Sequence, residues 1–320
     1  EVIYGFFLIL CVYFFLREKR YLALVAFFLA LLSKESAVML PFALMILSVH
    51  KKGYKRGIIA IMPYVALIGV YLLLRLLIAN AGFGGMTAQP LSARVFTMAA
   101  AAFDYIRLLL IPYPLSPYYP ARWYASITEP KVLIALTALV SISYLAFRMR
   151  TDKAMLFLLS FPFIMLAPVL WKVNTFPVWN ESANLAERFL YVPSAMFLLF
   201  ISVIAVRLTD GKKRRHIVAA GSITVAAFFI IFTVRSSMIW KNDIALFEQI
   251  VSDSPNTVFA HINLGNAYYR SDRFEDALME YRHALSLNPE DAEARYNLSL
   301  VLAMKNAVDS GVRPENGRKW

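Results

Sequence analysis

The chain has 320 residues, of which 59% are apolar, 14% aromatic and only 17% charged, and its mean hydropathy is +0.57. Soluble domains carry about a quarter charged residues, so this composition excludes a disordered chain and argues against an ordinary water-soluble enzyme. The formal charge is +12, from 33 Lys and Arg against 21 Asp and Glu. The single cysteine, Cys11, excludes a disulfide framework and a cysteine-rich metal site. The four histidines show no metal-ligand spacing, so no metal site is expected.

Long apolar runs alternate with short basic connections. Eight runs are candidate membrane helices: Val2–Leu16, Tyr21–Leu32, Ala37–Val49, Gly57–Ala79, Val132–Phe147, Ala154–Trp171, Phe189–Val206 and Ile217–Val234. A hydrocarbon core of about 30 Å requires about 20 helical residues, and several runs reach that length. The two runs that flank Ser33–Ser36 are too short for two full spans, so they form either a hairpin of short helices or one broken helix.

The basic residues predict an orientation. Fifteen of them fall in four connections: Arg17/Lys19/Arg20, Lys51/Lys52/Lys55/Arg56, Arg148/Arg150/Lys153 and Arg207/Lys212/Lys213/Arg214/Arg215. Under the positive-inside rule these connections are cytoplasmic, which places residues 80–131 and everything after Val234 outside. The positive charge is therefore a topology signal, and nucleic-acid binding is not expected.

The outer loop 80–131 contains more than a linker. A glycine-rich start, Gly82–Gly85, precedes a predicted helix over Ala93–Ile111, and four prolines among aromatic residues follow it. A partly apolar, charged helix before an aromatic belt is typical of a segment on the membrane surface. The alternative, another span at 96–112, would break the alternation of basic and non-basic connections.

The composition becomes that of a soluble domain from Ser236 onward. Residues 258–291 match the tetratricopeptide pattern at seven positions, which we expect to form the repeat core: Leu264, Gly265, Tyr268, Ala277, Tyr281, Ala284 and Pro289. Seven matches at a 34-residue period are a strong signal. Lys241–Val251 resembles the end of a preceding repeat, and Ala292–Met304 the first helix of a following one. The sequence thus predicts an all-α fold with a membrane domain over 1–235, repeats over 236–304 and a tail over 305–320.

Three groups of ionisable residues lie within or beside the apolar runs: Lys34-Glu35, Arg75 and Glu187-Arg188. Each group also has a simpler explanation. Lys34 and Glu35 could pair with each other or with a neighbouring helix. Arg75 could extend to the outer headgroups, and Glu187-Arg188 could be a charge pair at a helix start. Together they suit an anionic ligand whose tail lies in the bilayer, such as a lipid-linked phosphate. We expect three residues to bind that phosphate, Lys34, Arg75 and Arg188, and three to orient them, Glu35, Glu187 and Tyr191.

A resemblance joins these features. Ser33-Lys34-Glu35 before an apolar helix, Leu108–Ser116 ending in Pro-Leu-Ser, Ala186-Glu187-Arg188 with Tyr191–Ser194, and the terminal repeats occur in that order. This sequence resembles the transmembrane and tetratricopeptide-repeat O-mannosyltransferases and their bacterial relatives, in the GT-C glycosyltransferase superfamily. The resemblance implies a polytopic GT-C-like helical bundle followed by a tetratricopeptide-repeat α-solenoid.

The resemblance also implies a function. Such enzymes transfer a sugar, typically mannose, from a polyprenyl-phosphate donor substrate to a Ser or Thr hydroxyl of a protein, without a cofactor. They work in the ER membrane or the bacterial inner membrane, with the repeats lumenal or periplasmic. The expected partners are membrane lipid, the lipid-linked sugar, and an acceptor protein or peptide bound by the repeats. The family's catalytic acidic pair lies in a first outer loop, expected upstream of Glu1, because the chain begins inside a hydrophobic run and reads as a fragment.

Other functions stay open on the sequence alone. An oligosaccharide polymerase or ligase would also use a lipid-linked donor. A transporter would fit charges near broken helices, although no inverted repeat is visible. A membrane-anchored scaffold would need only the repeats, which by themselves imply partner binding.

Overall fold

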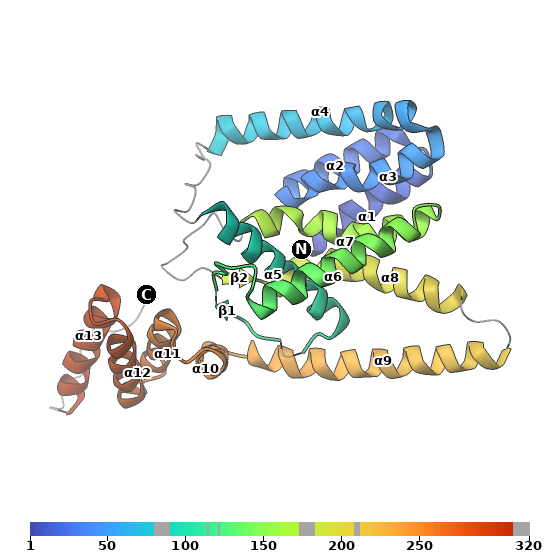
Figure 1. Cartoon of the computed structure of the whole chain (residues 1–320). Coiled ribbons are helices and arrows are strands. Elements are labelled where there is room, and N and C mark those ends of the chain that lie inside the picture. Colours follow the sequence, from blue (N-terminus) through green and yellow to red (C-terminus); the bar gives the residue numbers. More distant parts are fainter. Residues whose placement is uncertain (80–89, 114, 121, 173–182, 208–211, 310–320) are drawn as a thin grey trace. The chain divides into compact units, whose positions relative to one another are not determined.

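The computed structural model describes residues 1–79, 90–113, 115–120, 122–172, 183–207 and 212–309. Within those ranges it is built almost entirely from helices, α1 to α13, with two 3-10 helices and two short strands (Figure 1). The all-α expectation is confirmed. The chain divides into two compact units, one of Glu1–Tyr113 with Ala121–Val218 and one of Pro114–Pro120 with Ala219–Trp320.

Most helices follow the apolar runs of the sequence. The first unit contains α1 (Val2–Leu16), α2 (Arg20–Ser33), η1 (Glu35–Met39), α3 (Leu40–Lys52), α4 (Tyr54–Ala79), α5 (Leu91–Leu110), α6 (Pro130–Arg148), α7 (Lys153–Lys172), β2 (Ala183–Leu185), η2 (Glu187–Leu190) and α8 (Tyr191–Arg207). Helix α9 (Lys212–Ile239) runs from this unit into the next. The second unit contains β1 (Tyr119–Pro120), α10 (Asp243–Asp253), α11 (Val258–Arg270), α12 (Phe274–Leu287) and α13 (Ala292–Asp309).

Five helices among the described residues are long and apolar enough to cross a membrane: Tyr54–Ile78, Pro130–Arg148, Lys153–Leu170, Glu187–Arg207 and Val218–Ile239. Three more apolar helices are shorter, at Val2–Leu16, Arg20–Ser33 and Glu35–Val49. In the window Val218–Ile239 none of the residues is buried by protein, although its side chains are mostly apolar. Apolar helices that expose their side chains on this scale require lipid around them, and the chain is a membrane protein.

The chain is interrupted between α2 and α3. Lys34 adopts an extended conformation, with φ −160° and ψ 132°, and ends α2. Five residues of 3-10 helix follow in η1 before α3 begins with Pro41 in its first turn, where a proline loses no helical hydrogen bond. The break lies where the sequence places Ser33–Ser36, between the two short apolar runs.

The core of the first unit gathers apolar side chains from α1, α2, η1, α3, α4, α7 and α8. Alanines on α2, such as Ala23 and Ala30, are fully buried and let the neighbouring helices approach. Larger side chains fill the remaining space, among them Phe27, which meets Tyr64 edge to face with ring centroids 5.4 Å apart. This packing holds the interrupted segment against α1, α4 and α7.

The second unit has the expected repeat geometry. Gly265 on α11 lies so close to α12 that a Cβ there would be 2.6 Å from Cε1 of Tyr281. Tyr281 is buried, and its hydroxyl donates to Asn266 at 2.7 Å. The Tyr268 hydroxyl donates to Glu248 on α10 at 2.7 Å, which joins the preceding helix to the repeat. The tetratricopeptide assignment is confirmed, and Gly265 and Tyr281 lie at the contact between α11 and α12.

A buried ionisable pair also joins α11 to α12. His261 Nδ1 lies 2.6 Å from Glu280 Oε2, and His261 Nε2 donates to the Pro255 carbonyl at 2.8 Å. Burial alone lowers the pKa of His261, but the Glu280 carboxylate and the Pro255 carbonyl outweigh it and hold that pKa above its usual value. Protonated His261 therefore stabilises the folded repeat.

The Gly265–Tyr281 contact makes a first prediction. Gly265→Leu should overpack the contact and destabilise the repeats by about 1–3 kcal/mol. Hydrogen exchange of residues 258–287 in the solubilised protein should accelerate, while exchange in the first unit stays unchanged. Ala303→Leu is the control, since it adds the same side chain at an exposed position of α13. Equal exchange in the two variants would contradict the close approach.

The His261–Glu280 pair makes a second prediction, with the sign fixed by the raised pKa. Its stabilisation is complete below about pH 6.5, the value of an unfolded histidine, and is lost as the pH rises through the higher folded pKa. Protection of residues 258–287, corrected for the intrinsic pH dependence of exchange, should therefore decrease across that interval. His261→Gln should remove most of this dependence. A wild-type protection that increases with pH would show that the pair is not held protonated.

Candidate functional site

Lys34 is held by the chain break that it occupies. Its backbone N–H still donates to the Ala30 carbonyl at 2.9 Å, and its carbonyl accepts from Ala37 at 3.1 Å. The extended backbone between these bonds directs the side chain out of the helical path. Its ammonium forms an ion pair with the Glu1 carboxylate and lies 4.6 Å from the centre of the Phe189 ring. The side chain is only 19% exposed, so this cation is largely removed from solvent.

Arg75 and Glu35 form a second ion pair, between α4 and the first residue of η1. Their side chains are 44% and 31% exposed. The pair is therefore screened, and its contribution to stability is smaller than that of a fully buried pair. Its structural effect is to fix the start of η1 against α4, directly after Lys34.

The motif around Arg188 lies close to Lys34, although the two are far apart in the sequence. Ala186 is extended, with φ −146° and ψ 125°, and η2 begins at Glu187. The Arg188 guanidinium lies 5.3 Å from the centre of the Phe189 ring. Both Lys34 and Arg188 thus contact one aromatic ring, an arrangement that is favourable for cations. The structure brings together two of the three cations that the sequence nominated, from segments more than 150 positions apart.

Tyr105 positions this segment, and the sequence analysis missed it. The Tyr105 hydroxyl on α5 accepts a hydrogen bond from the backbone N–H of Ala186 at 3.3 Å. The residue is fully buried and packs with Leu166 and Val169 of α7, against which Phe189 also rests. A tyrosine after a run of alanines gives only a weak signal of this role, because its partner is a backbone group far along the chain.

Tyr191 packs against α1 at a glycine. A Cβ at Gly5 would lie 3.0 Å from Cε1 of Tyr191 and 3.3 Å from Cγ2 of Val192, so a larger residue would separate α8 from α1. The structure thereby places Tyr191 in the contact between α8 and α1. Glu187 opens η2 in its first turn, where a carboxylate is favoured by the helix dipole.

The charges of this cluster are balanced. Lys34 is paired with Glu1 and Arg75 with Glu35, while Glu187 directly precedes Arg188 in η2. An anionic ligand would therefore exchange with a carboxylate or add to the exposed guanidinium of Arg188. Within the described ranges, no group of three His, Cys, Asp or Glu side chains is arranged to hold a metal ion.

Comparison with known proteins supports the motif-based resemblance. A tetratricopeptide repeat model matches residues 265–306. The chain is 33% identical over 106 residues to the protein O-mannosyl-transferase F38B6.6 of Caenorhabditis elegans, a match to 33% of this chain and 15% of that relative. It is 26% identical over 113 residues to the protein O-mannosyl-transferase Tmtc2 of Drosophila melanogaster, covering 35% of this chain and 12% of the relative. The matches thus span a small part of these relatives' length. Over about a third of its own length, the chain is similar to protein O-mannosyl-transferases, which confirms the resemblance that its motifs indicate.

Proposed function

We propose that this chain is part of a membrane glycosyltransferase that moves a sugar, mannose in the family it resembles, from a polyprenyl-phosphate donor to protein Ser or Thr. The observation that carries the proposal is the meeting of Lys34 and Arg188 at the Phe189 ring. The similarity to two protein O-mannosyl-transferases favours this chemistry over transport.

The chemistry requires fixed positive charge beside the donor phosphate. When the sugar leaves, the phosphate gains negative charge, so a cation held in place stabilises the transition state more than the ground state. An arginine fork can bind two phosphate oxygens at once, and lysine supplies a compact charge. Arg188 is assigned the first role and Lys34 the second. Arg75 is paired with Glu35, the residue that follows Lys34.

The balanced charges suggest how the donor enters. Before the donor binds, Glu1 neutralises Lys34 and Glu35 neutralises Arg75. A phosphate that displaces one carboxylate keeps the cation paired, and the displaced side chain of Glu1 or Glu35, which is partly exposed, turns to solvent. The polyprenyl chain then lies along the apolar surface of the bundle, where large side chains such as Leu73 and Leu198 are exposed.

The repeats are proposed to bind the acceptor. In the second unit, the Ser116 hydroxyl donates to the Asp253 carboxylate at 2.6 Å, and the Tyr118 ring meets Phe259 edge to face at 4.9 Å. The surface of α10 and α11 therefore holds a serine in a proline-rich segment of this same chain. A serine-bearing segment of another protein can be recognised by the same two contacts, which suits an acceptor of a Ser/Thr-directed transferase.

A second candidate, a membrane-anchored scaffold, rests on the repeats alone. Repeats bind partners in proteins of many functions, so they do not distinguish the two. The cation cluster does, because a scaffold has no use for paired charges gathered among apolar helices, where they are costly.

The orientation makes a third prediction. We place the basic connections in the cytoplasm and the cation cluster and repeats outside. With buried Cys11 replaced by alanine and the protein expressed in a bacterial inner membrane, Arg148→Cys should resist a maleimide that reaches the periplasm but does not cross that membrane, and Asn256→Cys should react. Labelling of position 256 only after permeabilisation would reverse the orientation.

The donor site makes a fourth prediction. In the intact protein, Arg188→Ala should lower the rate of sugar transfer about 100-fold or more, as loss of other fixed charge stabilisers does. Arg188→Lys should recover only part of the rate, since a point charge replaces a fork. The control is Arg148→Ala, an exposed arginine of a basic connection. Transfer from a lipid-phosphate donor should be compared at matched membrane levels, and equal rates would return Glu187-Arg188 to a charge pair at a helix start.

A further inference from the structure

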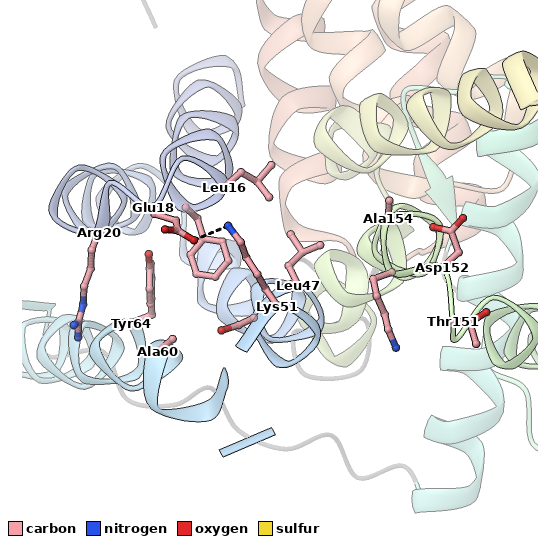
Figure 2. Close-up of a pocket in the computed structure, with 13 residues that line it drawn as sticks. Leu16, Glu18, Arg20, Leu47, Lys51, Ala60, Tyr64, Thr151, Asp152 and Ala154 are labelled. Atoms are coloured by element: carbon pink, nitrogen blue, oxygen red, sulfur yellow. Dashed lines mark ion pairs between the residues drawn. The ribbon is translucent and has the colours of Figure 1, made fainter. Parts of the chain in front are cut away.

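A second concentration of charge lies where the basic connections meet. A cavity of about 730 Å³ opens between the end of α1, the start of α2, the ends of α3 and α4 near their junction, and the connection before α7 (Figure 2). Its apolar wall includes Phe15, Leu47 and Tyr64. Its basic wall is formed by three side chains, from three different connections: Arg20, Lys51 and Lys153.

The charges of the wall do not cancel. Lys51 is paired with Glu18 at 2.6 Å, a pair that Figure 2 shows between Arg20 and Asp152. The other acidic residue, Asp152, is paired with Arg207 of α8, which lowers the pKa of its carboxyl. Both acidic groups thus have basic partners. Arg20 and Lys153 form no ion pair with another described residue, and the Lys153 ammonium donates only to the Arg150 carbonyl, at 2.5 Å.

This combination selects a kind of ligand. Two unpaired cations attract an anion, and phosphate oxygens suit the donors of arginine and lysine. A free phosphate would make no contact with the apolar wall, whereas the first carbons of an acyl chain would pack against it. The cavity also lies where apolar helices end, which is the depth of lipid headgroups in a bilayer. Basic pockets between membrane helices bind anionic headgroups in this way.

We infer that this cavity binds an anionic phospholipid, with Arg20 and Lys153 on its headgroup phosphate and the first part of an acyl chain against Phe15, Leu47 and Tyr64. The three basic connections then do more than set the orientation of the protein. They build one lipid site, which joins α2 to the start of α7 through a shared ligand. This inference is independent of the donor site and of the proposed transferase activity.

Native mass spectrometry of the purified full chain tests the inference, with phosphatidylglycerol as the probe and phosphatidylcholine as the lipid without net charge. The wild type should retain more phosphatidylglycerol than phosphatidylcholine. Arg20→Gln with Lys153→Gln should reduce that retention about tenfold or more, since each basic residue near a membrane surface contributes measurably to anionic lipid binding. The matched control is Arg17→Gln with Arg148→Gln, which removes two charges from the same two connections outside the cavity wall.

A third variant separates the cavity from its charge. Ala154→Trp leaves the charge unchanged and fills space in the cavity, and it should also reduce phosphatidylglycerol retention. Equal losses in the charge variant and its control would show attraction to basic connections in general and overturn the inference. Displacement of the lipid by millimolar glycerol phosphate would show that the acyl chain contributes nothing, and would overturn it as well. A lipid retained equally by wild type and Ala154→Trp would place it elsewhere.

Discussion

Pairing of charge among apolar helices is the constraint on which the first unit depends. An unpaired ammonium or guanidinium in such surroundings is costly, so each must find a carboxylate, an aromatic face or a ligand. Lys34 finds Glu1 and the Phe189 ring, and Arg75 finds Glu35. These contacts join α1, η1, α4 and η2, elements that are distant in sequence. The extended backbone at Lys34 ends α2, and the side chains of Lys34 and Glu35 pair with residues of different elements on either side of it.

The two charged regions lie at opposite ends of one short helix. Arg20 begins α2 and Lys34 follows its last residue, and its 14 residues span about 21 Å. The Lys34 end is neutralised by carboxylates and faces the aromatic ring of η2. The Arg20 end carries unpaired cations beside a cavity. In the proposed account, a phosphate enters the first region by exchange with a carboxylate or by binding to exposed Arg188, which suits a donor that must leave again. The second region suits a lipid that stays bound.

Much of this architecture could be predicted from the sequence, because its strongest signals are local. Apolar runs located α1, α4 and α6 to within a few residues, since a membrane helix needs only length and hydrophobicity. The repeat was predictable from a fixed period, and the small residue at Gly265 correctly indicated a close helix contact. The contacts of the site were harder to predict from the sequence. Tyr105 bonds to a backbone N–H, and Gly5 makes room for Tyr191, so both depend on helix packing that no local pattern encodes. The residue types suggested that Arg75 and Glu35 would form ion pairs. That they pair with each other could be known only from the fold.

The central claim is that Lys34 and Arg188 act together on one donor phosphate, and a double-mutant cycle on binding tests it most directly. The affinity of a polyprenyl monophosphate would be measured for the wild type, Lys34→Gln, Arg188→Gln and the double variant. If both cations hold one phosphate, each single change weakens binding, and the combined loss departs from the sum by more than about 0.5 kcal/mol. Strictly additive losses, or unchanged affinity in the double variant, would show that the two cations do not share a ligand and would contradict the account.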